Sequence, residues 1–400
     1  MDLDDFQNLL KPFGQQALEK AVALQPQEKD FLRHFDVLSR SYSRHLARAA
    51  LETAILREKA TSKFPFAKQL YFTREALEQA SNWEVSTYRC GRFRRFERVM
   101  DLGCSIGGDT LALSQITSVV GIDIDQLRLA MAAANARAVF PDQTIGFIQA
   151  DISECLPIHS ASRTGVFFDP SRRTKSKRIY SIHDYQPALK TIESWLPQYS
   201  AVGAKISPGV NLDELHGFDA EVEFISLRGE LKEAALWFGP LKTTCRRATV
   251  LPELHTLEED FDYSPEEDRE RLPIDEPGRY LYEPDPSVLR AKLVSKLGEM
   301  LGAVQLDPDI AYLTSDKVVD TPFARCWQVE DWFPFGLKRL RAYLRERRVG
   351  QVVVKKRGSP IQPEALIREL RLNGEKEKLV FLTHLRGKPV VVICFPNFQG

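Results

Sequence analysis

The sequence predicts an α/β protein in three parts: a helical extension, a doubly wound sheet and a small α/β domain. Residues 1–95 carry apolar side chains at helical spacing, with almost no strand pattern. Over residues 96–252, short apolar runs alternate with helical stretches, which is typical of a parallel sheet with helices on both faces. Residues 277–400 hold strand and helix patterns in a shorter span. We therefore expect three domains over these ranges, with residues 253–276 as a linker.

The overall composition limits the class of protein. With 400 residues, 43% hydrophobic and 28% charged, the chain has the profile of a globular protein of two or three domains. Basic and acidic residues both number 55, so contact with nucleic acid would depend on local basic patches. The start, MDLDDFQNLLKPF, lacks a signal-peptide pattern, and no apolar run approaches the roughly 20 residues that span a bilayer. We expect a cytoplasmic protein with no membrane partner.

The helical extension is predicted from the spacing of its apolar residues. Between residues 31 and 59 they recur at intervals of three and four, so they share one helix face. Thr73 precedes the segment REALEQA and has a side chain suited to an N-cap. We predict helices throughout residues 1–95.

Seven apolar runs predict the strands of the sheet. They are FERVMDL, SVVGIDI, IGFIQA, GVFFD, SAVGAKI, EVEFISL and AALWFG. The segments between the first four have helical spacing, as in DQLRLAMAAANARAVF, which favours parallel pairing. Because AALWFG and RRATVL are close in the sequence, we expect them to form a hairpin and make the edge of the sheet mixed.

The last third of the chain begins with an acidic stretch. Residues 253–276 hold eleven acidic and two basic residues, which indicates a solvated linker or insertion. Helices are then expected in PDPSVLRAKLVSKLGEMLGA and DWFPFGLKRLRAYLRERR. A strand in VGQVVVKKRG, a helix in PEALIRELRLNG and a terminal hairpin should complete the small domain.

The segment VMDLGCSIGGDTLALS, residues 99–114, predicts a strand, a glycine-containing turn and a helix. Asp101 ends the strand, Gly103 allows the turn, and Gly107 and Gly108 keep side chains away from a ligand. Backbone N–H groups at the start of the following helix would face that ligand. Cys104, in the turn, is better explained as a small packing residue than as a nucleophile. A glycine turn alone also occurs in proteins that bind no nucleotide.

Two further acidic residues make the pattern more specific. Asp123 ends the second strand of the sheet, where a carboxylate can accept both hydroxyls of a ribose. Asp151 follows the third strand and should lie on the same edge. The run D-x-G-x-x-x-G-G differs from the G-x-G-x-x-G of dinucleotide-binding proteins. The three acids and the turn together predict a nucleotide-like ligand of another kind.

This pattern resembles the first motif of class I S-adenosylmethionine-dependent methyltransferases, over residues 97 to about 240. The resemblance implies a Rossmann-like methyltransferase sheet and S-adenosyl-L-methionine as cofactor. It implies that the leading acid and the glycine turn surround the amino-acid end of the cofactor, with roles for Asp101, Gly103, Cys104, Ser105, Gly107 and Gly108. It also implies that Asp123 holds the ribose and that Asp151 meets the adenine amine.

The fourth strand ends in VFFDPSRRTK, where the substrate nucleophile of such enzymes usually meets the cofactor. Enzymes that methylate nucleobase amines read Asp/Asn-Pro-Pro-aromatic at this place. The acid and a backbone carbonyl accept the amine hydrogens, and the aromatic ring stacks on the base. Asp169 and Pro170 match that motif and are the predicted catalytic residues. Ser171 and Arg172 depart from it, so stacking would need the Arg172 guanidinium or a remote aromatic ring.

Basic residues follow Asp169-Pro170 directly. Arg172, Arg173 and Lys175 come first, and Lys177 and Arg178 complete five positive charges in seven residues. Such a run can be a solvated loop, but beside an active edge it is also placed to hold substrate phosphates. We predict the first three as substrate-binding residues.

A narrower resemblance covers most of the chain. The segment from LREKATSKFPF to CGRF, with the glycine turn and FFDPSRR, is similar to bacterial relatives of the trimethylguanosine synthase (RNA cap guanine methyltransferase) group. The C-terminal part, from RYLYEPDP to LRLNG, is similar to the THUMP-like domain that accompanies them. THUMP domains belong to RNA-modifying enzymes. The resemblance implies methylation of a nucleobase nitrogen of structured RNA, such as tRNA or rRNA.

Other hypotheses stay open at this point. The missing aromatic allows a non-catalytic RNA-binding or assembly factor, and the neutral net charge allows a methyltransferase for a protein or a small molecule. A second basic cluster of Lys338, Arg339, Arg341, Arg345, Arg347 and Arg348 could contact RNA or be a plain amphipathic surface. Six cysteines without a C-x-x-C pair and isolated histidines predict no metal site.

Overall fold

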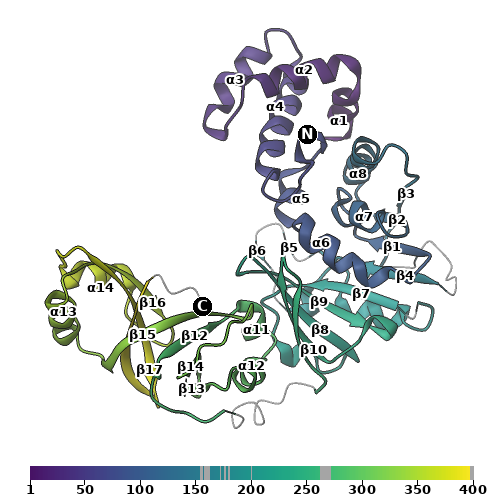
Figure 1. The fold of residues 1–400 in the computed structure, drawn as a ribbon. Coiled ribbons are helices and arrows are strands. Elements are labelled where there is room, and N and C mark those ends of the chain that lie inside the picture. The colour runs from purple at the N-terminus through teal and green to yellow at the C-terminus, as the bar shows by residue number, and fades with distance from the viewer. Residues whose placement is uncertain are drawn as a thin grey trace. The chain divides into compact units, whose positions relative to one another are not determined.

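A computed structural model describes residues 1–153, 156, 163–171, 173–174, 177–178, 181–199, 201–261 and 272–396 (Figure 1). The chain forms two compact units. The first unit comprises Met1–Glu221 and Lys232–Thr243, and the second comprises Val222–Leu231 and Thr244–Gly400. In the described ranges, no helix is long and apolar enough to cross a membrane.

The first unit begins with the predicted helices. They are α1 (Leu3–Leu10), α2 (Pro12–Ala23), α3 (Phe31–Leu38), α4 (Arg44–Ala60), α5 (Arg74–Gln79) and α6 (Trp83–Cys90). Thr73 is the N-cap of α5, and its hydroxyl accepts the N–H of Ala76 at 3.1 Å, as the sequence predicted. Ser43 caps α4 in the same way.

The helical extension shares its hydrophobic core with the sheet domain. Buried residues of the extension, such as Leu51 and Phe72, form one cluster with Ile106 and with Met131 of α8 (Gln126–Val139). The buried Asn135 amide of α8 also accepts the N–H of Tyr71 at 2.7 Å and donates to its carbonyl at 3.1 Å. The extension and the sheet therefore pack as one body.

Six strands form the sheet of the first unit, in the order β9-β7-β4-β1-β2-β3. Their bounds are β1 (Arg98–Leu102), β2 (Ser118–Asp123), β3 (Gly146–Gln149), β4 (Thr164–Phe168), β7 (Ala201–Ile206) and β9 (Glu230–Phe238). Helix α7 (Gly108–Leu113) follows β1, and the short α9 (Ile192–Trp195) precedes β7. The strands β1, β2, β3, β4 and β7 are parallel to one another, and β9 runs antiparallel to β7. The doubly wound fold is confirmed, and the parallel strands end at one edge.

Two short strands follow β4. β5 (Arg173–Thr174) and β6 (Lys177–Arg178) pair antiparallel as a separate ladder. They fall in the basic segment predicted after Asp169-Pro170. Arg172 and Lys175 of that segment lie outside the described residues.

One pairing predicted from the sequence is wrong. β10 (Arg246–Leu251) pairs parallel with β8 (Ala220–Leu227) and antiparallel with β11 (His255–Glu259), while β9 pairs with β7. The expected hairpin partner of β10 was the end of β9. Residues 239–245 are too long for a tight hairpin turn and begin with the 3-10 turn Gly239–Leu241, so they carry the chain to β8 instead.

The second unit contains a sheet in the order β13-β14-β12-β15-β18-β17-β16. Its strands are β12 (Tyr280–Pro284), β13 (Val304–Asp307), β14 (Ile310–Ser315), β15 (Ala324–Pro334), β16 (Val349–Lys356), β17 (Lys376–Leu385) and β18 (Lys388–Cys394). Its helices are α11 (Pro286–Arg290), α12 (Val294–Leu301), α13 (Leu337–Glu346) and α14 (Pro363–Leu370). The predicted strand, helix and terminal hairpin are β16, α14 and β17–β18.

Part of the expected linker is regular structure. β11 falls inside residues 253–276, and its Leu257 is buried. Residues 262–271 lie outside the described residues. The division into domains at residues 95, 252 and 276 stays a prediction.

Candidate functional site

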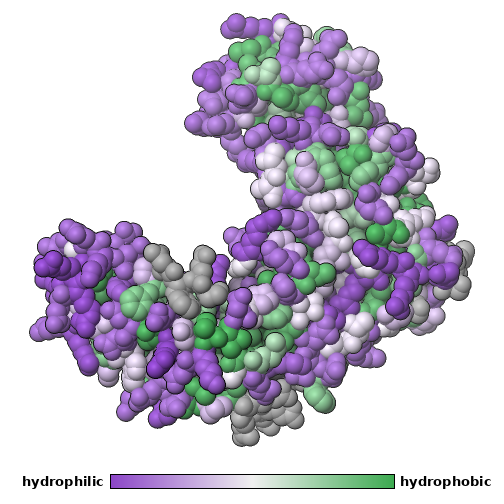
Figure 2. Space-filling view, in the orientation of Figure 1, coloured by the Kyte–Doolittle hydropathy of each residue, from purple (hydrophilic) through white to green (hydrophobic). Residues whose placement is uncertain are grey.

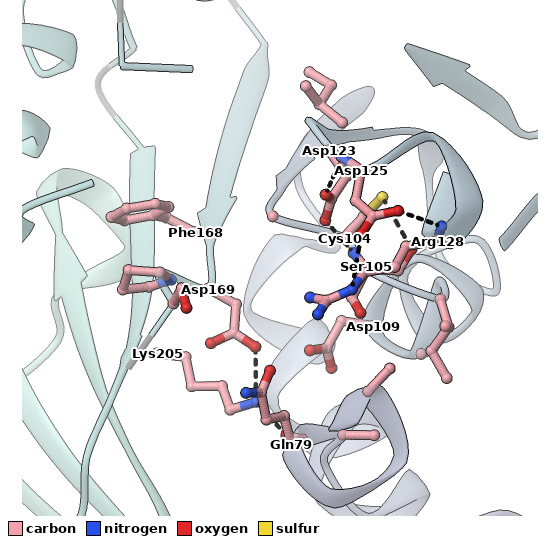
Figure 3. A pocket seen from close by; sticks show the side chains of 18 of the residues that line it. Gln79, Cys104, Ser105, Asp109, Asp123, Asp125, Arg128, Phe168, Asp169 and Lys205 are labelled. Atoms are coloured by element: carbon pink, nitrogen blue, oxygen red, sulfur yellow. Dashed lines mark hydrogen bonds and ion pairs between the residues drawn. The ribbon is translucent and has the colours of Figure 1, made fainter. Parts of the chain in front are cut away.

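A cavity of about 900 Å³ opens at the carboxyl edge of the parallel strands in the first unit (Figure 3). Most of the predicted site residues line it, and they are Gly103, Cys104, Ser105, Gly108, Asp123, Asp151, Asp169 and Pro170. Because parallel strands end at the same edge, residues far apart in the sequence meet there. Asp101 and Gly107 are not among the lining residues.

The glycine turn after β1 brings the backbone close to the cavity. Gly103 has φ +79°, and a Cβ atom there would lie 2.5 Å from the carbonyl oxygen of Asp169. Gly107, the N-cap of α7, has φ +83°, and its added Cβ would lie 3.1 Å from the Cβ of Ala132. Both positions favour glycine for their conformation, and Gly103 also lacks space for a Cβ atom.

The leading acid of the motif is not on the cavity wall. The Asp101 side chain is buried and accepts the Thr110 hydroxyl at 2.5 Å. Burial, together with the nearby charge of Asp109, raises the pKa of Asp101 to about 8. The acid that lines the cavity from this motif is instead Asp109, in the first turn of α7.

Asp123 closes the turn against the second strand. Its Oδ2 accepts the N–H of Ser105 at 2.8 Å, and its Oδ1 accepts the N–H of Asp125 at 2.9 Å. Asp151, after the neighbouring strand β3, also lines the cavity and is exposed, and the Ser153 N–H donates to it at 2.9 Å and lowers its pKa. Ile124, next to Asp123 in the chain, also lines the cavity and is 63% exposed.

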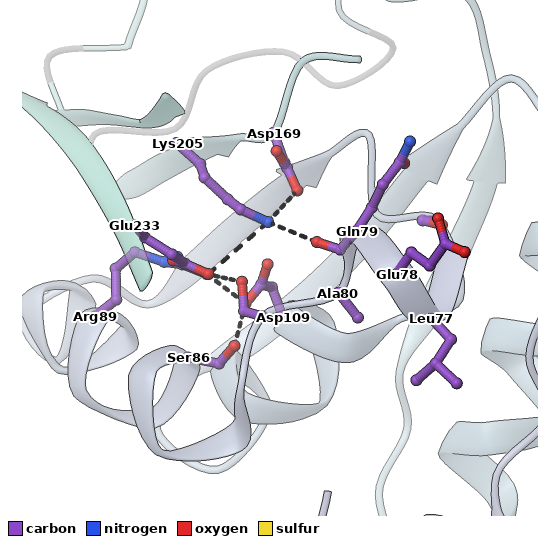
Figure 4. Close-up of polar contacts among 12 residues, drawn as sticks. Leu77, Glu78, Gln79, Ala80, Ser86, Arg89, Asp109, Asp169, Lys205 and Glu233 are labelled. Atoms are coloured by element: carbon purple, nitrogen blue, oxygen red, sulfur yellow. Dashed lines mark hydrogen bonds and ion pairs between the residues drawn. The ribbon is translucent and has the colours of Figure 1, made fainter. Parts of the chain in front are cut away.

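Asp169 lies across the cavity from this wall and is held by a buried lysine (Figures 3 and 4). The Nζ of Lys205, on β7, donates to Asp169 Oδ2 at 2.8 Å and to the carbonyl of Gln79 at 3.3 Å. Glu233 of β9 lies 4.0 Å from the same Nζ. Among the described residues, Asp169 Oδ1 has no hydrogen-bond partner, so it is available to a ligand.

Only part of the predicted substrate-binding set falls within the structure. Arg172 and Lys175 lie outside the described residues, and Arg173 is described by its backbone in β5 alone. Ser171, next to Pro170, pairs with Gln186 through two backbone hydrogen bonds of 3.0 and 3.1 Å.

Tyr185, beside Gln186, is an aromatic residue that lines the cavity near this edge. Its hydroxyl accepts the Ser207 N–H at 2.9 Å, and the side chain is only 2% exposed. Tyr185 therefore packs into this edge and does not present an open stacking face.

Sequence reasoning missed many of the lining residues, among them the polar residues Lys63, Gln79, Asp109, Lys205 and Glu233. A lysine inside the apolar run SAVGAKI was a usable signal, because an unpaired buried ammonium is costly. Lys63, Gln79 and Glu233 carried no recognisable pattern, since the helical extension and β9 are brought to the cavity only by the fold. Asp109 lies in the glycine motif, next to Gly108, but the pattern gives it no role.

The charges on the wall suit a ligand that carries positive charge. Seven acidic residues line the cavity, against the four basic residues Lys63, Arg128, Lys205 and Lys232. The close backbone approach at Gly103 and the acidic excess fit a nucleoside with a cationic group. In the part of the chain that the structure describes, no group of three or more His, Cys, Asp or Glu side chains is placed to hold a metal ion.

Known proteins resemble the chain in sequence and in fold. Two proteins of Mycobacterium tuberculosis, from strains CDC 1551 and ATCC 25618 / H37Rv, are each 34% identical over 349 residues, covering 84% of this chain and 92% of theirs. Both are described as uncharacterized S-adenosylmethionine-dependent methyltransferases. A crystal structure from Porphyromonas gingivalis W83, of a protein provisionally assigned as a methyltransferase, has a TM-score of 0.74 at 23% identity and covers 93% of this chain and 100% of that one.

Two family models match parts of the chain. Residues 324–396 match the THUMP domain-like family. Residues 2–60 match a domain of unknown function (DUF8688). The first range falls in the second unit, from β15 to the end of β18, and the second falls in helices α1 to α4.

Proposed function

The chain belongs to the S-adenosylmethionine-dependent methyltransferase family, and from this membership we propose that it methylates a nucleobase nitrogen of a structured RNA, such as tRNA or rRNA. The protein is an enzyme that uses S-adenosyl-L-methionine. The observation that carries the substrate proposal is the Asp169-Pro170 edge, where one carboxylate oxygen is held by Lys205 and the other is available.

The bound cofactor supplies a methyl group on a positively charged sulfur, which needs little activation. We assign its nucleoside to the wall formed by Ser105, Asp123, Ile124 and Asp151, which line one side of the cavity. The acidic excess of the cavity supports this assignment, because it favours a cation.

Asp169 is the proposed catalytic residue. Its available Oδ1 would accept one hydrogen of a base amine, and the backbone carbonyl near Pro170 would accept the other. The nitrogen lone pair then stays directed at the methyl group, and positioning of this kind lowers the barrier to transfer. Lys205 supports the arrangement because it fixes the orientation of the Asp169 carboxylate.

The cavity charges also bear on how RNA would approach. A neutral base can enter a cavity lined by seven acidic and four basic residues more easily than a negatively charged phosphate can. We infer that the target base is turned out of its stack into the cavity, while its phosphates stay outside. Arg172, Arg173 and Lys175 remain the proposed phosphate contacts.

The THUMP-like match supports RNA as the substrate, because THUMP domains occur in RNA-modifying enzymes. A cytoplasmic location and a relationship to the trimethylguanosine synthase group belong to the same proposal. Figure 2 shows a mostly hydrophilic surface around α13 and α14 of the second unit.

Much of the basic charge of α13 has partners within the second unit. Arg341 donates to the carbonyl of Glu369 at 2.5 Å, and Arg345 donates to that of Arg371 at 2.8 Å, at the end of α14. The guanidinium of Arg347 lies 3.6 Å from the centre of the Tyr343 ring. The exposed Lys338 and Arg348 are therefore the better candidates for phosphate contacts.

Methylation of RNA taken from cells that lack the protein tests the proposal. We expect labelled cofactor and enzyme to modify this RNA, with the product identified by mass spectrometry of its nucleosides. Asp169→Ala should abolish transfer while cofactor affinity persists. RNA binding without any transfer would favour a non-catalytic factor, and label only on protein or small molecules would overturn the RNA substrate.

A further inference from the structure

Asp109 has no role in the sequence pattern, yet it is the acid that the glycine turn presents to the cavity. We propose that Asp109 binds the α-ammonium group of the cofactor, in place of the leading acid Asp101. The inference depends on the cofactor, which family membership establishes, and not on the proposed RNA substrate.

Asp101 cannot fill this role in the described structure. It is 1% exposed, does not line the cavity, and is bonded to the Thr110 hydroxyl. Its Oδ1 is buried without a hydrogen-bond partner in the described part of the chain. A carboxyl group in this position favours its neutral form, because burial disfavours the charge.

The contacts of Asp109 leave one oxygen for a ligand (Figure 4). Its Oδ1 accepts the Ser86 hydroxyl at 2.5 Å and the Arg89 Nη2 at 2.5 Å, both from α6. No residue in the described ranges bonds to its Oδ2. The side chain is 11% exposed and faces the cavity next to the Lys205–Asp169 pair (Figures 3 and 4).

The buried Arg89 keeps the Asp109 carboxylate ionised. Arg89 is 1% exposed, pairs with Asp109 and with Glu233, and stacks over the Phe167 ring at 4.5 Å. Burial alone would raise the pKa of Asp109, but the charges of Arg89 and then Lys205 lower it. An ionised carboxylate on a partly buried wall forms a strong charge-assisted hydrogen bond to an ammonium group.

The position of Asp109 also agrees with the rest of the wall. Ser105 and Gly108 line the cavity in the same turn and lie on the side of Asp123, to which the ribose is assigned. Asp169, at the transfer edge, lies on the other side of Asp109 (Figure 3). The amino-acid end of the cofactor would then extend from the ribose toward α6.

Binding calorimetry with two nucleosides tests this assignment on the full chain. S-adenosylhomocysteine carries the ammonium group, and 5′-methylthioadenosine lacks the whole amino-acid end. Asp109→Asn should weaken binding of S-adenosylhomocysteine by about 10- to 100-fold, the range for a lost charged hydrogen bond. It should leave binding of 5′-methylthioadenosine unchanged. Asp101→Asn is the matched control and should leave both affinities unchanged.

Each other outcome overturns the proposal. Unchanged affinity for S-adenosylhomocysteine in Asp109→Asn would exclude the contact. An equal loss for both nucleosides would show a distorted cavity and not a lost ammonium contact. Selective loss in Asp101→Asn would return the role to the leading acid. A wild-type protein that binds neither nucleoside would remove the cofactor assignment itself, whereas failure to methylate RNA would leave this result untouched.

Discussion

Gly103 determines how closely the end of β1 approaches the end of β4. Its positive φ and the 2.5 Å that would separate an added Cβ from the Asp169 carbonyl leave no room for a side chain. We expect Gly103→Ala to lower the free energy of unfolding by about 1–3 kcal/mol and to weaken cofactor binding. Gly91→Ala is the control, because an added Cβ there meets nothing within 4 Å. Equal stability of the two variants by urea unfolding would contradict the argument.

Asp101 predicts a pH dependence of stability. Its pKa is raised from 3.8 to about 8, so the folded state keeps a proton that the unfolded chain releases between these values. Because of this group, the free energy of unfolding of the wild type should fall as the pH rises from about 4 to about 8, by on the order of 1 kcal/mol per pH unit. Asp101→Asn cannot ionise, so its stability relative to wild type should rise from pH 4 to pH 8 and then level off. Chemical unfolding at several pH values measures this, with the exposed Asp142→Asn as control.

Lys205 tests whether the orientation of Asp169 matters for transfer. Lys205→Met keeps the length of the side chain but removes the 2.8 Å hydrogen bond to Asp169. We expect the rate of methyl transfer to fall about 100-fold, as small misplacements of a reacting group do, with cofactor affinity unchanged. Lys205→Arg should recover part of the rate. An unchanged rate in Lys205→Met would show that Asp169 needs no support.

At the scale of elements, the shared core joins the helical extension to the cofactor cavity. Leu51 of α4 is fully buried in the cluster that includes Met131 of α8, whereas Leu32 of α3 is 76% exposed. Leu51→Ala should lower the free energy of unfolding by about 2–5 kcal/mol, and Leu32→Ala should have little effect. The cofactor-binding part should unfold in the same transition as the helices. Two separate unfolding transitions in calorimetry, with the cofactor still bound after the helices have unfolded, would contradict a shared core.

The element scale also shows the limit of local pattern reading. The strands and the N-cap at Thr73 follow from apolar spacing and side-chain chemistry, and both are confirmed. The pairing partner of β10 does not follow from the local pattern, because it depends on the path of the chain after β9. Strand existence is local information, whereas strand neighbours are set by the whole sheet.

At the scale of the molecule, RNA binding should involve the second unit. Exposed Lys338 lies in the first turn of α13 and exposed Arg348 follows its end, whereas Arg341 and Arg345 of this helix have partners. We expect the double variant Lys338→Glu, Arg348→Glu to weaken RNA binding and to reduce its salt dependence by about two charges, with cofactor affinity unchanged. The double variant Lys29→Glu, Lys68→Glu, at two exposed lysines of the helical extension, is the matched charge control. Equal loss in both variants, measured by filter binding across salt concentrations, would indicate a nonspecific charge effect.

The sequence by itself determined the fold class, the glycine turn and several residues of the cavity wall, because each follows from a strand end or a local conformation. Asp123, Asp151 and Asp169 could be found this way, since the ends of parallel strands must share an edge. Only the tertiary structure decided that Asp109 and not Asp101 faces the cavity, and that Lys205 holds Asp169. Both results depend on which residues the fold buries and on which side chains of α6, β7 and β9 come into contact. The residue spacing within one segment determines neither.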